Sequence, residues 1–217
     1  MRNVRIAAVA FLAAFVASVA CAPASRAADI LVTVDASSIA DGTAGFLDFQ
    51  FNAGGTGAQL ATALIMNFTS ANLTLGAITH DGASSGGPLP ANVTILNDPN
   101  NLVNGPLQAV TFGANASFSF ILRLTGPALN TVSDFSTTFF LNLVGPEPDY
   151  DSLLPGAVPH LSITIPQDGS GDLVIDSVPQ ITAVVVPEPG TVVMALAGAV
   201  LLAATKVFRQ KSARLPS

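Results

Sequence analysis

The sequence predicts an all-β domain, an antiparallel β-sandwich with a jelly-roll-like arrangement, flanked by an N-terminal signal helix and a C-terminal transmembrane helix. Between residues 28 and 185, apolar and polar residues alternate in short runs, which is the pattern of half-buried strands. Gly, Pro, Asn and Asp separate these runs, as expected for tight turns. Away from the chain ends no stretch has a convincing helical period, although residues 57–66 could form one turn of helix.

The alternation predicts about nine to eleven strands and the face that each one buries. The predicted strands are residues 30–34, 46–51, 61–68, 73–78, 93–96, 110–112, 117–124, 135–144, 161–165, 173–175 and 181–186. The side chains expected to face the core are Leu47, Phe49, Phe51, Phe118, Phe120, Leu122, Leu124, Phe139, Leu141 and Leu143. Residues 82–90 and 145–159 are expected to be surface loops, and residues 168–172 a hairpin turn.

The N-terminal residues 1–27 have the layout of a secretory signal peptide. Arg2 and Arg5 precede an uncharged apolar run over residues 6–20. Small residues follow, and they predict cleavage between Ala27 and Ala28. The alternative for the same pattern is an N-terminal membrane anchor that is not cleaved.

Cys21 is the only cysteine of the chain, and it lies inside this N-terminal segment. Its surroundings match a lipoprotein cleavage box poorly, because Ser18 stands where a large apolar residue is usual. Simple cleavage after Ala27 is therefore favoured over lipidation. The mature protein would then contain no cysteine, which excludes disulfides, thiol chemistry and thiolate metal sites.

The C-terminal segment, residues 186–214, divides into three parts. Residues 186–190 contain Pro187, Glu188 and Pro189, and the two prolines prevent helix or strand from continuing. Residues 191–205 are apolar and uncharged, and as a helix they would span roughly 22 Å, extended to about 27 Å if Lys206 snorkels to the interface. Residues 206–214 form a basic tail, which the positive-inside rule places in the cytoplasm. The charges that set this topology are Lys206, Arg209, Lys211 and Arg214.

This C-terminal layout allows an ordinary single-pass anchor, but it also resembles a named sorting signal. Pro187-Glu188-Pro189-Gly190, the apolar run and the basic tail are similar to the PEP-CTERM sorting signal of Gram-negative bacteria. The resemblance implies recognition by an exosortase, a membrane protease or transpeptidase, and delivery to the cell surface or to an exopolysaccharide matrix. A second tripeptide, Pro146-Glu147-Pro148, is followed by acidic residues rather than by an apolar run, and so lacks this context.

The middle of the chain carries a second resemblance. Residues 44–52, 86–90 and 112–113 are similar to a group of small PEP-CTERM proteins with no assigned activity. The shared features are turn glycines and apolar strand residues, so this resemblance implies a secreted β-rich domain and no particular chemistry.

The predicted secreted domain is strongly acidic. Thirteen Asp and Glu residues lie between residues 28 and 186 with Arg123 as the only Lys or Arg, so thirteen negative charges less one positive charge leave −12. Nucleic acid and anionic membrane surfaces are therefore poor partners on electrostatic grounds. The apolar content is high enough for a packed core, which excludes a disordered chain.

The sequence offers few candidates for chemistry, and it predicts no catalytic residue, metal site or cofactor. His80 and Asp81 are adjacent, but the motifs of serine hydrolases and zinc proteases are absent, so a loop-capping or solvent-exposed role is favoured for them and for His160. Asp168, with Ser170 and Asp172, has the alternating oxygens of a calcium loop, but the hairpin interpretation is favoured there.

These observations together predict a non-enzymatic exported protein of the cell surface or extracellular matrix. It would be anchored transiently in the membrane, processed by an exosortase and then displayed or released, for example in a biofilm. The alternative is a ligand-binding module for exopolysaccharide, through Asp and Asn side chains, or for calcium. A hydrolase has no motif to support it.

Overall fold

The computed structural model describes residues 27–187, and these residues form the all-β antiparallel fold that the alternation predicts. The ten strands belong to one hydrogen-bonded sheet. They are β1 Ala27–Asp35, β2 Thr43–Ala53, β3 Thr62–Asp81, β4 Ser84–Gly86, β5 Val93–Leu96, β6 Gly105–Thr125, β7 Thr137–Val144, β8 Leu161–Ile165, β9 Val174–Ser177 and β10 Ile181–Val186. A 3₁₀ turn, Pro127–Leu129, follows β6. The two helices predicted at the ends of the chain lie outside the described residues.

The long strands β3 and β6 organise this sheet. They pair with each other along most of their length. The other side of β6 is shared by two strands. Its first half pairs with β2 and its second half with β1. From these two halves the sheet continues as β2-β7-β8-β9 on one side and as β1-β10 on the other.

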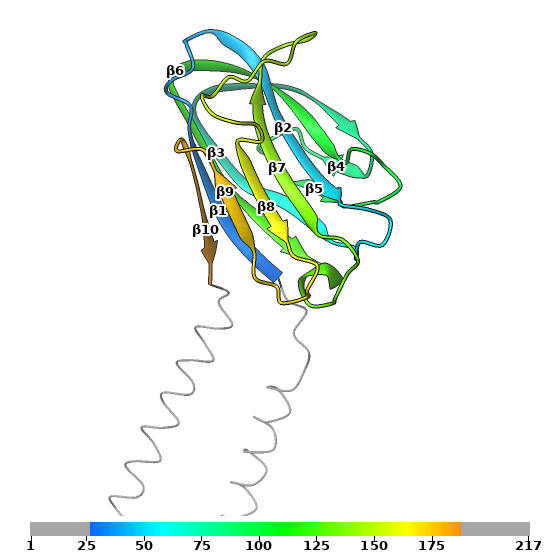
Figure 1. Cartoon of the computed structure of the whole chain (residues 1–217). Coiled ribbons are helices and arrows are strands. Elements are labelled where there is room, and N and C mark those ends of the chain that lie inside the picture. The colour runs from blue at the N-terminus through cyan, green and yellow to red at the C-terminus, as the bar shows by residue number, and fades with distance from the viewer. Residues whose placement is uncertain (1–26, 188–217) are drawn as a thin grey trace, which may run out of the picture.

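The sheet folds over on itself and so produces two layers. Figure 1 shows β2, β7 and β8 lying in front of β1 and β6. Phe49 of β2 and Phe120 in the second half of β6 meet edge to face across the interior, with ring centroids 5.6 Å apart. We call the layer that contains β2 the β2 layer and the layer that contains β1 the β1 layer. One folded sheet thus takes the place of the two separate sheets of a simple sandwich.

Three asparagines lie where β3 and β6 turn from one layer into the other. Asn67, Asn72 and Asn115 have φ angles of 55°, 54° and 56°, a left-handed conformation that Asn adopts more readily than other non-glycine residues. The pairing of β3 with β6 shifts register between Met66 and Thr69 and again after Ala71. The sequence led us to expect turns at these places, whereas the structure has bulged bends inside continuous strands.

The core lies between the layers, and every side chain predicted to face it is buried. Phe51, Phe120 and Phe139 are among the largest side chains that are fully buried. They come from different strands, and alternation along each strand sends every second residue inward. The predicted hydrophobic faces are therefore confirmed.

Two local expectations were wrong. Residues 57–66 form no helical turn; a loop leads instead into β3, whose pairing with β5 and β6 holds Thr62 onward in extended conformation. Residues 82–90 are not entirely loop, because β4 lies within them and pairs with β5. In both places strand pairing with a distant partner, which the local sequence does not reveal, decides the conformation.

The two ends of the described chain leave the domain at the same pole. β1 begins at Ala27 beside Thr125, the last residue of β6, and Asp29 lies opposite Val186, the last residue of β10. We call this the exit pole, and Figure 1 shows it at the bottom of the domain. The loops 54–61, 126–136 and 166–173 meet there, joined by the hydrogen bonds from Gly54 N to Ser136 O and from Ser133 N to Gln167 O.

The opposite end, which we call the distal pole, contains the bends of β3 and β6, the loop 36–42 and the loop 145–159. Backbone hydrogen bonds from Ala36 N to Ala116 O and from Gly42 N to Phe112 O join the first loop to the bend of β6.

Candidate functional site

The candidate sorting motif begins where β10 ends. Among residues 27–187, β10 pairs with β1 and has no strand on its other side. Val184 and Val185 are about half exposed, at 54% and 49%, and Pro187 is exposed. Proline cannot donate to a strand ladder, so pairing ends there for a local reason. Pro187 is therefore the first motif residue beyond the sheet, and it lies at the exit pole.

An ion pair fixes the strands beside this exit. Arg123 donates from Nε and Nη2 to the two carboxylate oxygens of Asp29, both at 2.7 Å. Val186, Asp29 and Arg123 are neighbours in one row across β10, β1 and β6. The bidentate pair thus holds the start of β1 next to the end of β10. Nothing local in the sequence indicated the partner of Arg123, which lies 94 residues away along the chain.

The predicted signal-cleavage residues lie inside β1. Ala27 is opposite Thr125 and Ala28 is opposite Leu124, so both residues pair with β6, and the pairing of β1 with β10 begins at the next residue, Asp29. The cleavage itself stays a prediction.

Most of the predicted sorting residues lie outside the described part of the chain. This holds for Glu188, Pro189, the apolar run 191–205 and the four topology charges Lys206, Arg209, Lys211 and Arg214. Within residues 27–187, no helix is long and apolar enough to cross a membrane.

His80 braces the hairpin that connects β3 to β4. Its Nδ1 lies 3.0 Å from Ser84 Oγ and its Nε2 lies 2.9 Å from the carbonyl oxygen of Gly86. Both ring nitrogens are thus engaged in local contacts on an exposed turn. This agrees with the loop-capping role favoured from the sequence.

His160 differs from the expectation of a capping or solvent-exposed role, because its side chain is fully buried. The backbone N–H of Leu143 donates to its Nδ1 at 3.0 Å, so the neutral ring carries its proton on Nε2. Nε2 lies 2.7 Å from Ser152 Oγ, and that hydroxyl donates to the carbonyl oxygen of Leu154. Burial lowers the pKa of His160, which keeps it neutral. Its polar atoms are therefore used for structure.

Residues 168–172 form the predicted hairpin turn between β8 and β9. Asp168 Oδ1 accepts the backbone N–H of Ser170, and Ser170 Oγ accepts the backbone N–H of Asp172. The hydrogen bonds that Ser170 gives to the Asp168 carboxylate, the backbone N–H first, lower the pKa of Asp168. In the part of the chain that the structure describes, no three His, Cys, Asp or Glu side chains are arranged to hold a metal ion.

A polar ladder runs along the outer face of the β2 layer. Gln50 Nε2 and Asn142 Nδ2 both donate to Asp48 Oδ2, and Asn52 Nδ2 donates to Gln50 Oε1. Phe140 lies opposite Gln50 on β7 and so on the same face. We call these five residues the outer ladder. Burial raises the pKa of Asp48, and the Asn142 and Gln50 donors oppose the rise.

One atom of the outer ladder has no protein partner. Asn142 Oδ1 is buried and accepts no hydrogen bond from the residues described. Buried polar atoms are normally satisfied. The ladder thus combines hydrogen-bonding side chains with one aromatic ring on the outer face of the β2 layer.

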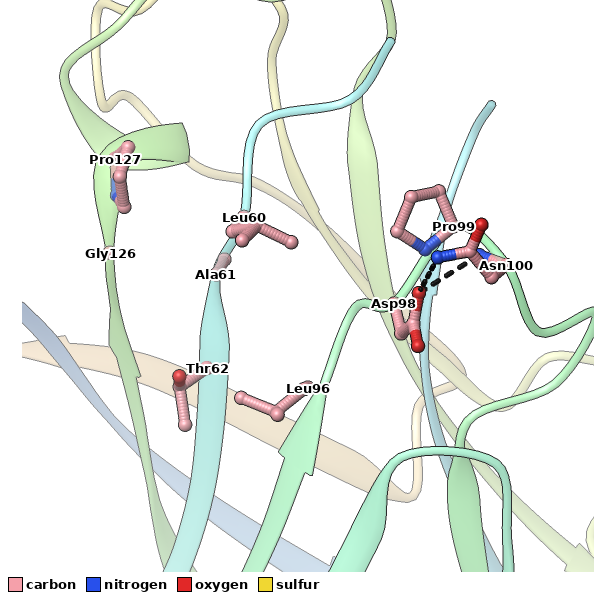
Figure 2. Close-up of a pocket in the computed structure, with 9 residues that line it drawn as sticks. All are labelled: Leu60, Ala61, Thr62, Leu96, Asp98, Pro99, Asn100, Gly126 and Pro127. Atoms are coloured by element: carbon pink, nitrogen blue, oxygen red, sulfur yellow. Dashed lines mark hydrogen bonds between the residues drawn. The ribbon is translucent and has the colours of Figure 1, made fainter. Parts of the chain in front are cut away.

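A shallow, mainly apolar hollow lies beside the exit pole (Figure 2). Its lining includes the apolar side chains of Leu60, Leu96 and Pro127. Asp98 is turned toward its own loop, where its Oδ1 accepts two hydrogen bonds from Asn100. The hollow therefore presents apolar side chains next to the place where the chain leaves the domain.

Comparison with known proteins identifies the segment that follows β10. A family model described as the PEP-CTERM protein-sorting motif matches residues 185–211. No curated protein and no solved structure matches the chain. The matched region starts on the last residues of β10 and includes the proline pair, the apolar run and the first three basic residues of the tail. The chain therefore ends in a PEP-CTERM protein-sorting motif, which marks an exported protein that an exosortase sorts to the cell surface.

Proposed function

We propose that this chain is a non-enzymatic protein of the cell surface or extracellular matrix, held by residues 191–205 during export and cut by an exosortase near Pro187. The observation that supports this most strongly is the match at residues 185–211, placed directly after an exposed strand end. The exposure of Pro187 supports access by a membrane enzyme. The jelly-roll-like character of the domain belongs to the same proposal, supported by the two facing layers.

Under this proposal, the pairing of β1 limits when the signal peptide can be cut after Ala27. Proteases bind their substrates as extended, unpaired chain, whereas residues 27 and 28 are paired with β6 and directly precede the residues of β1 that pair with β10. We infer that the cut, if it falls there, precedes the insertion of β1 between β6 and β10. The ion pair of Asp29 with Arg123 would then form after cleavage.

The C-terminus of the mature protein tests the main proposal. The chain would be produced in a host that has an exosortase, with an epitope inserted at Ala157 in the exposed part of the loop 145–159. Mass spectrometry of the terminal peptide should find an end near Pro187. The triple change P187A/E188A/P189A is the control, and it should leave a chain that ends at Ser217.

A chain that ends at Ser217 in both versions would contradict exosortase processing and indicate an ordinary membrane anchor. An intact motif with a new terminus that survives the triple change would show that the proline pair is not the recognition element.

The second candidate function is a ligand-binding module, and the outer ladder is the observation that favours it. Its oxygens and amides could hydrogen-bond the hydroxyls of an exopolysaccharide, with Phe140 beneath a sugar ring. Calcium is a second possible ligand through the acidic side chains. Thermal unfolding of the secreted domain would be followed with neutral polysaccharides and with calcium, using Q50A/N142A as the comparison. A stabilisation that disappears in Q50A/N142A supports binding at the ladder; equal curves with and without ligand count against it.

A further inference from the structure

We propose that the exit pole rests on the lipid bilayer through an apolar rim while the C-terminal segment is still in the membrane. The rim consists of Leu60, Leu96, Val132, Phe135, Val184 and Val186. The occupant is the boundary between the headgroups and the acyl chains of the bilayer. This inference rests on the proposed membrane-held stage of export and adds which face of the domain meets the membrane.

The first argument is the length of the tether. Only residues 187–190 separate the end of β10 from the apolar run that starts at Thr191. Four extended residues reach at most about 14 Å. The headgroup region on one side of a bilayer is itself roughly 5–8 Å thick. The exit pole therefore cannot stand far from the membrane once residues 191–205 are inserted.

The second argument is the character of the side chains at this pole. Val132 is 71% exposed, Leu60 is 60% exposed, and Leu96 and Phe135 are also exposed. They come from three separate segments: the loop 54–61, the end of β5 and the loop 126–136. The last two valines of the rim lie on the same outer face of β10, because alternation places Val184 and Val186 together. Exposed apolar side chains gathered at one end of a domain indicate an interaction surface.

The third argument is the contrast with the distal pole. That end carries Asp35 and Asp41 around the first loop, and Glu147, Asp149 and Asp151 in the loop 145–159. Its exposed apolar residues, Tyr150 and Val158, lie in that same acidic loop. The exposed apolar side chains are therefore more numerous at the exit pole than at the distal pole, although carboxylates lie at both ends.

The charges at the exit pole also determine which lipid headgroups favour the contact. Asp98, Asp134, Asp168 and Asp172 lie on loops of the exit pole. Carboxylates repel anionic headgroups, and the repulsion is screened by salt. The contact is thus apolar in origin and is expected to be stronger on zwitterionic lipid than on anionic lipid.

The absence of tryptophan from the sequence allows a direct test. The full chain carrying L60W would be reconstituted into phosphatidylcholine vesicles that contain brominated lipid, with no exosortase present. Brominated acyl chains quench a nearby indole. We expect several-fold stronger quenching for L60W than for A71W, a matched chain with the indole at an exposed position near the bends of the distal pole. Equal quenching of the two chains would overturn the proposal.

A second variant separates contact from mere proximity. With F135W as the reporter, the triple change L60S/L96S/V132S should reduce quenching by at least half, and it changes only side chains that are already exposed. Unchanged quenching would overturn the role of the rim. If the triple variant fails to fold by circular dichroism, V132S alone serves, with a smaller reduction expected.

One control distinguishes lipid from a second copy of the chain as the partner of the rim. Another separates the bilayer contact from the sorting proposal. Quenching that depends on the ratio of protein to lipid would show that a second copy covers the rim instead of lipid. P187A/E188A/P189A should leave quenching unchanged while it abolishes processing. Normal processing without quenching would refute the bilayer contact alone.

Discussion

His160 connects three backbone segments through one imidazole ring. It accepts from Leu143 of β7, it contacts Ser152 in the loop 145–159, and its own carbonyl oxygen accepts the N–H of Val178. The acidic loop is thus attached to the sheet by a buried, neutral side chain. Nothing in the sequence around Pro159 indicated burial, because proline and glycine surround this residue in a loop-like stretch.

We expect H160A to reduce the free energy of unfolding by about 2–4 kcal/mol at pH 7.5, because it leaves a cavity and deprives the buried N–H of Leu143 of its acceptor. Urea unfolding of the secreted domain measures this. H80A, at an exposed histidine, is the matched control and should cost less than about 1 kcal/mol. Similar losses in the two variants would contradict the structural role of His160.

The pH dependence follows from the same burial. The pKa of His160 is lowered in the folded state, so only the unfolded state gains a proton near pH ~6.5. The stability that His160 contributes is complete above that pH and is lost as the pH falls below it. The difference in unfolding free energy between wild type and H160A should therefore shrink between pH 7.5 and pH 5. A constant difference would show that the ring does not titrate as a buried group.

For Asp48 we expect the opposite effect on stability from that of H160A, because removing the charge of Asp48 should increase the unfolding free energy. Burial raises its pKa in the folded state, so its charged form destabilises the domain at neutral pH. An asparagine oxygen can accept the same two hydrogen bonds from Gln50 and Asn142. We expect D48N to increase the unfolding free energy by about 1 kcal/mol at pH 7, and the gain to disappear below pH ~4, where the aspartate is also neutral. A less stable D48N would indicate that the carboxylate charge itself is needed.

The bends of β3 and β6 depend on backbone conformation more than on side-chain packing. Asn115 is exposed and has a φ of 56°. Valine in this conformation clashes with its own backbone, whereas glycine does not. We expect N115V to destabilise the domain by about 1–2 kcal/mol and N115G to stay within about 0.5 kcal/mol of wild type. Thermal unfolding compares them, and an equal loss in both would mean that the asparagine side chain, rather than φ, matters.

The same bends show where prediction of the fold from the sequence succeeded and where it failed. Alternation identified nearly all the strands and the buried faces, because it depends only on local geometry and a water-avoiding core. It could not show that residues 69–72 and 113–116 remain within strands, since asparagine and glycine are equally typical of turns. The attachment of β1 to β10 and β6 also stayed hidden, because pairing between distant segments leaves no local pattern.

The candidate site likewise has a part that was predictable from the sequence and a part that was not. Pro187, the apolar run and the basic tail were recognisable as a linear motif, because their residues are contiguous in the sequence. The outer ladder and the apolar rim were not, because each gathers residues from separate strands or loops. Leu60, Leu96 and Val132 look like ordinary scattered apolar residues until the fold places them at the exit pole.

Because the chain leaves the domain at the exit pole, the length of the tether, residues 187–190, determines how close the apolar rim stays to the membrane. A rim of six side chains has little affinity for lipid by itself, so its contact depends on the high effective concentration that four linking residues impose. Twelve Gly/Ser residues inserted between Val186 and Pro187 would add roughly 19 Å of mean reach. We expect quenching of the L60W chain by brominated lipid to fall to the level of A71W.

Processing should survive the same insertion, because the matched motif lies entirely beyond it except for its first two residues. The C-terminal peptide should still end near Pro187 in a host that has an exosortase. A processing defect in the spacer chain would mean that the enzyme reads β10 together with the motif. Undiminished quenching would mean that the rim binds lipid strongly without the tether, and the domain would then stay on the membrane after its C-terminal segment is removed.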